Sequence, residues 1–540
     1  MILLNLDERP EVFKTSFAEF VFVVLIMMAQ FLVQATTAMA LSTLDIISAS
    51  FEHQTGQVLT YSQQIWFPSS VALTCGTFIL VSGRLGDLFG LKHMVMAGWI
   101  WMSIWTLING LLYYSASVPF FIVCRAFSGI GFALSVPSGM GILGRVYPNG
   151  PRKHLVFGLL GACGPTGATG GVLLGAICAK YIWWPWYFWI VSITALIFCI
   201  LSYYFLPDVN NCKTWEDFKF ACSQFDFLGS AVGVIALILL IFSLAQAPAA
   251  GWDSAYIIVC LVISIALIAL FFWLEVKYVA HPFIPRNIYN MKLLLVLLIM
   301  TFGWGSFGVW QYIYWRLVIH LRGYNPVLAA LGYGPFIFFG IIAALSTSVI
   351  FKYVKPSLLI SIAATCFMVG CIMLAVTPVH QSYFQMTMGV QFVLAWAMDI
   401  SFPAASILIS DFLPLEHQGM GGSLINTSVN YSNAFFLALS LSVEKLIFDS
   451  TQSTIQSYRA AMYFAIGVAA LGVFCSIVFI YVQRNDKVGD IMEVEEFEDE
   501  SEEKLEINKF PTSDILEGHK EQVEFHRRLS QSSALANRMM

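Results

Sequence analysis

Long apolar segments recur along the chain, separated by short polar turns. A helix that crosses a bilayer needs about 20 mostly apolar residues, and fourteen segments meet this requirement. They are 17–41, 65–83, 94–114, 118–142, 155–179, 185–206, 228–247, 255–275, 293–318, 328–350, 357–377, 384–409, 419–443 and 460–482. The pattern predicts an all-α membrane protein. Because fourteen is an even number, both termini are expected on the same side.

Composition agrees with this prediction. Apolar residues form 58% of the chain and charged residues 11%, against about a quarter charged in soluble domains. No cleavable signal peptide is expected, because charged residues precede the first apolar segment and no small-residue cleavage site follows it. The first span is therefore expected to remain as an anchor.

Lysine and arginine on short loops stay in the cytoplasm. If the amino terminus is inside, the inside loops hold Arg84, Lys92, Arg145, Arg152, Lys153, Lys213, Lys219, Lys277, Arg286, Lys352 and Lys355. The outside loops and helix ends hold fewer, namely Lys180, Arg316, Arg322, Lys445 and Arg459. The first outside loop, 44–62, holds none. The bias predicts that both termini are cytoplasmic.

Residues 1–16 and 483–540 flank the membrane region. The second of these segments carries the acidic run from Asp490 to Glu503 and has few apolar residues. Such a composition cannot offset the entropy of ordering, so a disordered cytoplasmic tail is expected.

The sequence contains no pattern typical of an enzyme or an ATP-driven pump. A G-x-x-x-x-G-K-[ST] phosphate loop is missing, and the histidines are scattered singly. Nine of the eleven cysteines fall in apolar spans, where cysteine is ordinarily a small hydrophobic residue. We therefore expect no enzymatic activity, no cofactor, no metal, no disulfide and no nucleic-acid partner.

A glycine-broken charged turn, from Gly83 to His93, separates the second and third spans. It resembles the signature loop of the major facilitator superfamily, G-x-L-a-D-r-x-G-r-k, at five positions, with Leu88 and Leu91 where the family has basic residues. The five matching residues are Gly83, Leu85, Asp87, Gly90 and Lys92. Together with Arg84, these charges are predicted to form a conformational latch at a helix end.

Two further segments resemble motifs of the same family. Arg125 lies in the fourth span, where the family has an arginine implicated in proton coupling; snorkelling to the interface is the alternative. The fifth span resembles the antiporter motif G-P-x-x-G-G, although four residues, instead of two, separate Gly164-Pro165 from Gly170-Gly171. Glycines also permit close helix packing, so a tight helix crossing is expected there.

Polar residues within spans are costly in lipid unless they face a partner or a water-filled path. Asp399 lies near the middle of the twelfth span, beside Ser401 and Pro403. Burial favours its neutral form, which suits reversible protonation; a structural hydrogen bond to a neighbouring helix is the equal alternative.

Three amides recur in the thirteenth span at i, i+4 and i+7, which places them on one helical face. They are Asn426, Asn430 and Asn433. A solute path and helix–helix hydrogen bonding are both compatible with this stripe. Gln311, deep in the ninth span, is predicted to line a cavity.

Residues 17–482 resemble a fourteen-span member of the superfamily, with six-helix bundles at 17–206 and 292–482 and two inserted helices within 207–291. Four segments are similar to fungal drug:proton antiporters, in a subgroup with aminotriazole-resistance proteins, borate exporters and low-affinity ammonium transporters. These segments are Arg84–Gly90, Trp183–Trp186, Met398–Ala405 and Glu416–Ser432. Many such antiporters carry an aspartate in the first helix, where this chain has Val33 and Gln34.

Three functions remain compatible with the sequence. The first is proton-coupled export of a toxic small molecule or borate, by alternating access, with Asp399 as proton carrier. The second is low-affinity uptake or facilitated passage of ammonium or another small polar solute. The third is a non-transporting receptor or scaffold on the same fold. A monomer in the plasma membrane, rather than the vacuolar membrane, is expected.

Overall fold

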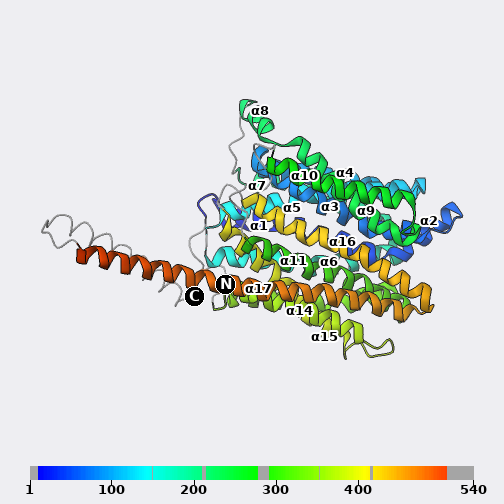
Figure 1. Cartoon of the computed structure of the whole chain (residues 1–540). Coiled ribbons are helices and arrows are strands. Elements are labelled where there is room, and N and C mark those ends of the chain that lie inside the picture. Colours follow the sequence, from blue (N-terminus) through cyan, green and yellow to red (C-terminus); the bar gives the residue numbers. More distant parts are fainter. Residues whose placement is uncertain are drawn as a thin grey trace.

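A computed structural model describes residues 10–148, 150–208, 215–277, 291–351, 353–413 and 418–507. The described chain is almost entirely helical (Figure 1). The first half contains α1 (Ser16–Ser42), α3 (Tyr61–Phe89), α4 (Leu91–Ser115), α5 (Val118–Val146), α6 (Pro151–Ile177) with a π-helical turn η2 (Cys178–Ile182), and α7 (Pro185–Phe205). Two helices follow between the halves, α9 (Phe227–Ala250) and α10 (Ala255–Lys277).

The second half begins with α11, which runs into a π-helical turn, η4. Its elements are α11 (Met291–Arg316), η4 (Leu317–Leu321), α12 (Pro326–Tyr333), α13 (Pro335–Ile350), α14 (Pro356–Val376), α15 (Thr387–Phe412), α16 (Gln418–Thr451) and α17 (Thr454–Ile507). Two short helices, α2 (Leu44–Thr55) and α8 (Trp215–Gln224), lie at opposite ends of the bundle (Figure 1).

The predicted fold class is confirmed. Within the described residues, thirteen helical segments are long and apolar enough to cross a membrane, and each overlaps a predicted span. The remaining predicted span, 419–443, lies in α16, a helix of 34 residues whose polar side chains lower its hydropathy.

The structure differs from the sequence-based expectation at α2, which occupies the predicted loop 44–62. Leu44, Ile47 and Phe51 are buried, and their spacing gives α2 one apolar face that packs on the bundle. The helix ends at Gly56, which has φ 68°, a left-handed conformation that glycine adopts without strain. The short helix α8 was likewise not expected from the sequence.

The tenth predicted span, 328–350, is interrupted. Proline lacks a backbone N–H, so Pro335 cannot continue the helical ladder, and the Gly334 N–H instead donates to the Leu331 carbonyl at 3.0 Å. The result is two helices, α12 and α13, in place of one.

The last helix continues beyond the membrane region. α17 extends to Ile507 and projects from the bundle as the red helix of Figure 1, where the sequence predicts disorder. The segment from Asp490 to Ile507 is rich in glutamate and has neither glycine nor proline, and glutamate is a good helix former. Residues 508–540 of the predicted tail lie outside the described residues.

Each half packs mainly on itself. In the first half, α3 and α4 pack on α5, α4 on α7, and α1 on α6; in the second half, α11 packs on α16 and α17, and α14 on α15 and α17. Two seams join the halves. At one seam α6 contacts α13 and α15, and at the other α3 and α5 contact α16.

The inserted helices are attached asymmetrically. α10 packs on α9, and α9 packs on both α3 and α16, so it covers the second seam. The Trp66 indole N–H donates to Gln246 Oε1 at 3.0 Å, and the Tyr431 hydroxyl donates to the Leu237 carbonyl at 3.2 Å. α9 therefore has one side-chain hydrogen bond to a helix of each half.

Candidate functional site

Asp399 lies on α15 where both halves meet. Its side chain is fully buried, and within the described part of the chain neither carboxylate oxygen has a hydrogen-bond donor. A Cβ placed on Gly340 of α13 would lie 3.1 Å from Asp399 Oδ2 and 2.7 Å from the Pro165 ring of α6. The carboxyl group therefore occupies the first seam, between α15, α13 and the proline of the predicted antiporter motif.

The glycines of α6 serve two different faces. Gly161 and Gly164 face α15, at Pro403 and Met398. Gly167 and Gly171 lie four residues apart and face the backbone of α1 at Phe31 and Ala35, which leaves no room for a Cβ. The predicted tight crossing is therefore the contact between α6 and α1. Gly170 packs on the ring of Phe31.

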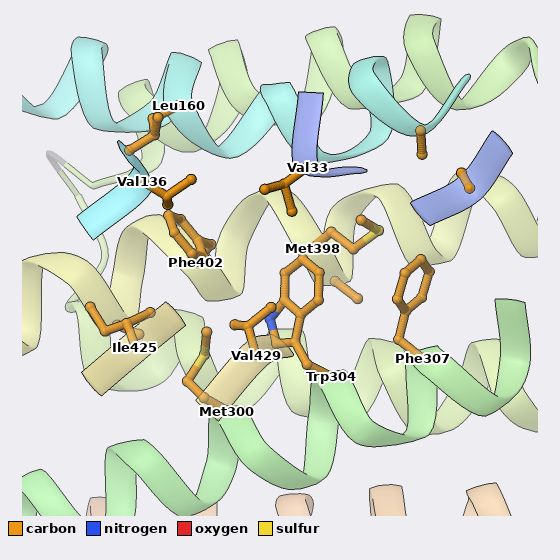
Figure 2. Packing of buried hydrophobic residues seen from close by; sticks show 14 of the residues in the cluster. Val33, Val136, Leu160, Met300, Trp304, Phe307, Met398, Phe402, Ile425 and Val429 are labelled. Atoms are coloured by element: carbon orange, nitrogen blue, oxygen red, sulfur yellow. The ribbon is translucent and has the colours of Figure 1, made fainter. Parts of the chain in front are cut away.

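Apolar side chains from both halves fill the centre of the molecule. Figure 2 shows Val33, Val136 and Leu160 of the first half converging on Trp304, Met398 and Phe402 of the second. All of these side chains are buried. The Trp304 indole donates to Ser401 Oγ at 3.2 Å. The halves are thus closed on one another at the level of Asp399.

Arg125, on α5, is 1% exposed. Its Nε donates to the Phe67 carbonyl of α3, and its Nη2 donates to the Thr36 carbonyl of α1 at 3.4 Å. The guanidinium also lies 5.9 Å from the ring centre of Phe188 on α7. In the described structure its hydrogen-bond partners are backbone carbonyls and no carboxylate, so Arg125 ties together three helices of the first half.

Of the three amides of α16, Asn426 contacts the other half. Asn426 is fully buried; its Nδ2 donates to the Gly422 carbonyl and contacts Met140 Sδ of α5, each at 2.9 Å. Asn430 donates to the Asn426 carbonyl of its own helix. Asn433 packs on Gly308 of α11. In the described residues, the Oδ1 atoms of Asn426 and Asn433 have no hydrogen-bond donor.

Gln311 and Gln34 are both buried. Gln311 Nε2 donates to the Tyr333 hydroxyl at 3.4 Å, across the gap between α11 and α12. Gln34 lies on α1, the helix that contacts α6. In the described structure, neither Gln311 nor Gln34 forms a hydrogen bond with Asp399.

Gln391 of α15 is a buried polar residue that sequence reasoning missed. It donates to the Tyr314 hydroxyl at 3.0 Å and to the Gly332 carbonyl at 2.8 Å, and it accepts from the Tyr383 hydroxyl at 3.2 Å. Gly332 lies just before the break at Pro335, so Gln391 satisfies a carbonyl that the interrupted helix leaves open. A single polar residue in an apolar segment is the only signal that the sequence offers.

Asp87, a residue of the predicted latch, lies at the end of the molecule that we call the Asp87 face. Arg145 Nη2 of α5 lies 2.7 Å from Asp87 Oδ1, and the backbone of Met420, at the start of α16, lies close to the same carboxylate. A carboxylate at a helix N-terminus is stabilised by the helix dipole. Asp87 thus joins the first half to the second.

The other latch residues have different roles. Arg84 lies within electrostatic range of Asp87 and of Glu275 on α10. Lys92 forms no ion pair with the Asp87 carboxylate in the described structure. Its Nζ donates to the Tyr203 and Leu206 carbonyls, each at 2.8 Å, and so caps the end of α7. Gly90 ends α3 with φ 118°, which requires glycine. Gly83 is buried within α3.

A second ion pair at the Asp87 face was not predicted. Arg152 binds both carboxylate oxygens of Glu19, at 2.9 and 2.7 Å, and the Tyr147 hydroxyl donates to Glu19 at 2.8 Å. The pair fastens the start of α1 to the start of α6. Glu19 is only three residues into α1, so from the sequence it reads as an interfacial charge.

The opposite end, which we call the α2 face, also has a polar contact between the halves. Asp45 of α2 lies 3.4 Å from His320 of η4, and His320 Nε2 lies 2.9 Å from Arg316 Nη1. Both faces are therefore closed by polar contacts, with the apolar centre between them.

Two helical halves that meet around a buried carboxyl group, with polar contacts at each end, define a secondary transporter that works by alternating access. The sequence pattern of the Major Facilitator Superfamily matches residues 26–218 and 351–513. The chain belongs to this family of membrane transporters.

Relatives of known sequence and a solved structure agree with this family assignment. The chain is 39% identical over 479 residues to the aminotriazole resistance protein of Saccharomyces cerevisiae, with 88% of this chain and 86% of the relative covered. It is 36% identical over 482 residues to the low affinity ammonium transporter of the same yeast (88% and 90%) and 35% identical over 461 residues to the efflux pump terJ of Aspergillus terreus (85% and 88%). The proton:xylose symporter XylE shares the fold, with a TM-score of 0.58 at 14% identity over 84% of this chain and 95% of that one.

Proposed function

We propose that this transporter exports a small toxic solute in exchange for protons, with Asp399 as the proton-binding group. The observation that carries the proposal is the position of Asp399, fully buried at the first seam with no hydrogen-bond donor to either oxygen among the described residues. An unpaired charge there is costly. The closed conformation therefore favours the neutral, protonated carboxyl, and the charged form favours a conformation in which water reaches the seam.

Alternating access follows from this preference. Protonation of Asp399 permits α6, α13 and α15 to pack closely, whereas loss of the proton favours separation of the halves at this seam. The polar contacts at Asp87 and at Asp45 then close opposite faces in turn. Asn426 and Asn433 have oxygens without donors in the described residues, and they are proposed to line the solute path together with Gln34 and Gln311. Arg125 is proposed to hold the first half rigid during the cycle.

The orientation of the chain is supported by its charge distribution, and export is supported by its relatives. The distribution of lysine and arginine favours a cytoplasmic Asp87 face and an α2 face on the opposite side. The plasma membrane is the proposed location. Relatives named for aminotriazole resistance and for efflux support a toxic small molecule as the solute. A monomer is the proposed working unit.

A second function is favoured by one specific residue. Where many antiporters carry an aspartate in the first helix, this chain has Gln34, which is buried and neutral. Together with the likeness to a low affinity ammonium transporter, this supports facilitated passage of ammonium without proton exchange.

The Asp399→Asn variant in proteoliposomes distinguishes these functions. With aminotriazole as probe, the variant is expected to lose accumulation driven by a pH gradient and to keep solute exchange, because exchange needs no net proton movement. Asp253→Asn, which changes an exposed carboxylate in the turn between α9 and α10, is the matched control and should accumulate normally. Retained accumulation in Asp399→Asn would exclude Asp399 as carrier. If methylammonium passes through both wild type and Asp399→Asn at a rate that does not depend on the pH gradient, the second function, facilitated passage, is established.

The latch gives a second prediction. Asp87→Asn removes the charge that pairs with Arg145. Since a hydrogen bond to a charged group contributes about 1.5–3 kcal/mol, the initial transport rate is expected to fall by about tenfold or more. Lys92→Gln is the control, because Lys92 caps α7 and should affect stability more than rate. Equal rates in Asp87→Asn and wild type, at equal surface expression, would contradict the latch.

A further inference from the structure

A cavity of about 490 Å³ opens at the α2 face, away from the seam that holds Asp399. Its walls come from the starts of α3 and α17, the ends of α9 and α11, and the last turns of α16. The volume lies in the range of small-molecule sites, about 300–1,000 Å³. The inserted helix α9 forms part of the wall through Pro248 and Ala249.

Glu444 lines this cavity and lies within electrostatic range of Arg316. The residue is 9% exposed, and in the described structure no donor reaches its Oε2. A buried carboxylate oxygen without a donor is unfavourable by several kcal/mol in apolar surroundings. A ligand that brings an N–H donor would satisfy it.

The same cavity wall also carries positively charged side chains. Arg316 lines the cavity, and its guanidinium is oriented by the Tyr312 hydroxyl, 3.1 Å from Nε, and by the Tyr312 ring, 5.4 Å away. Lys445 also lines the cavity and is paired with Asp449 at 3.1 Å. A negative group and positive groups therefore face one space, from positions that the fold holds in place.

We propose that this cavity binds a compact zwitterion, with a primary ammonium group donating to Glu444 and an adjacent carboxylate or phosphate accepting from Arg316. The hydroxyls of Thr454, Ser457 and Tyr458 on the rim supply further hydrogen bonds to such a molecule. A lone cation meets repulsion from Arg316 and Lys445, and a lone anion meets repulsion from Glu444. Only a molecule with both charges is matched at both ends.

This chemistry has two sources at the end of a membrane helix bundle, a free solute and the headgroup of an ethanolamine phospholipid. Both carry a primary ammonium beside an anionic group. Glycine betaine and choline phospholipids are the matched probes, since their methylated nitrogens have no N–H to donate.

The test is calorimetric titration of the full-length chain in nanodiscs made of phosphatidylcholine alone. Glycine is expected to bind, and glycine betaine, methylammonium and acetate to bind about tenfold more weakly or worse, as expected for loss of one charged hydrogen bond. Glu444→Gln should weaken glycine binding by a similar factor, while Asp253→Asn leaves it unchanged. The melting temperature of each variant verifies that it is folded.

The lipid source is tested in nanodiscs that contain phosphatidylethanolamine. If the headgroup is the occupant, this lipid weakens glycine binding and raises the melting temperature of wild type but not of Glu444→Gln; if a free solute is the occupant, neither changes. Absence of both glycine binding and lipid-dependent stabilisation overturns the proposal, as does equal binding of methylammonium or an unaffected Glu444→Gln. Because Asp399→Asn should bind glycine normally, failure of proton coupling and failure of this site are distinguishable.

Discussion

Replacing Gly171 with alanine is expected to prevent formation of the folded transporter. The new Cβ would overlap the Ala35 carbonyl and Cα atoms of α1. These are backbone atoms, which cannot rotate away as a side chain can, so α1 and α6 would have to separate along their whole crossing. Overpacking of this kind is unfavourable by about 1–3 kcal/mol or more. The yield of monodisperse protein after detergent extraction should fall by about tenfold, as measured by fluorescence-detected size-exclusion chromatography.

Gly164→Ala is the matched control from the same motif. Its added Cβ would lie 3.5 Å from the terminal methyl of Met398, an ordinary contact with a flexible side chain. This variant should fold and transport as wild type does. Equal yields for the two variants would contradict the view that the glycines of α6 are required by the crossing with α1.

Arg125→Ala is expected to abolish transport. The substitution leaves the Phe67 and Thr36 carbonyls without their donor in a buried site and removes the contact with Phe188. A buried acceptor left without a donor is unfavourable by about 1–3 kcal/mol, and two carbonyls are affected, so the initial transport rate should fall by about a hundredfold or more. Transport in proteoliposomes, normalised to the reconstituted protein, measures the effect.

Arg125→Lys should restore part of the activity, because lysine keeps the charge but not the planar fork that reaches two carbonyls. Lys180→Ala, at an exposed position after α6, is the control and should transport normally. Full activity in Arg125→Ala would show that the tie between α1, α3 and α7 is dispensable.

The spans could be predicted because a helix in lipid needs a long apolar segment, and each such segment is continuous in the sequence. The same holds for the crossing of α6, where glycine spacing alone indicates close packing. Asp399 stood out for a similar reason, as a carboxylate in a segment that should contain none. What the sequence could not supply was the partner of each of these residues.

Partners depend on contacts between distant segments. Lys92 matches a loop motif, yet it caps α7 through carbonyls more than a hundred residues away. Gln391 binds Tyr314 and Gly332, 77 and 59 residues from it. Glu444 could not be singled out from the sequence, because a charged residue just past the end of a predicted span is common. Its burial depends on α3, α9 and α17, which come together around it.

The position of α9 has a consequence for the speed of the transport cycle. The helix is fastened to α3 through Trp66 and to α16 through Tyr431, and these two helices belong to halves that must rotate relative to one another. A rigid helix cannot follow both, so each turnover has to break and remake one of these attachments. The insertion therefore raises the activation barrier of every cycle. A transporter built from the two halves alone would not have this contribution.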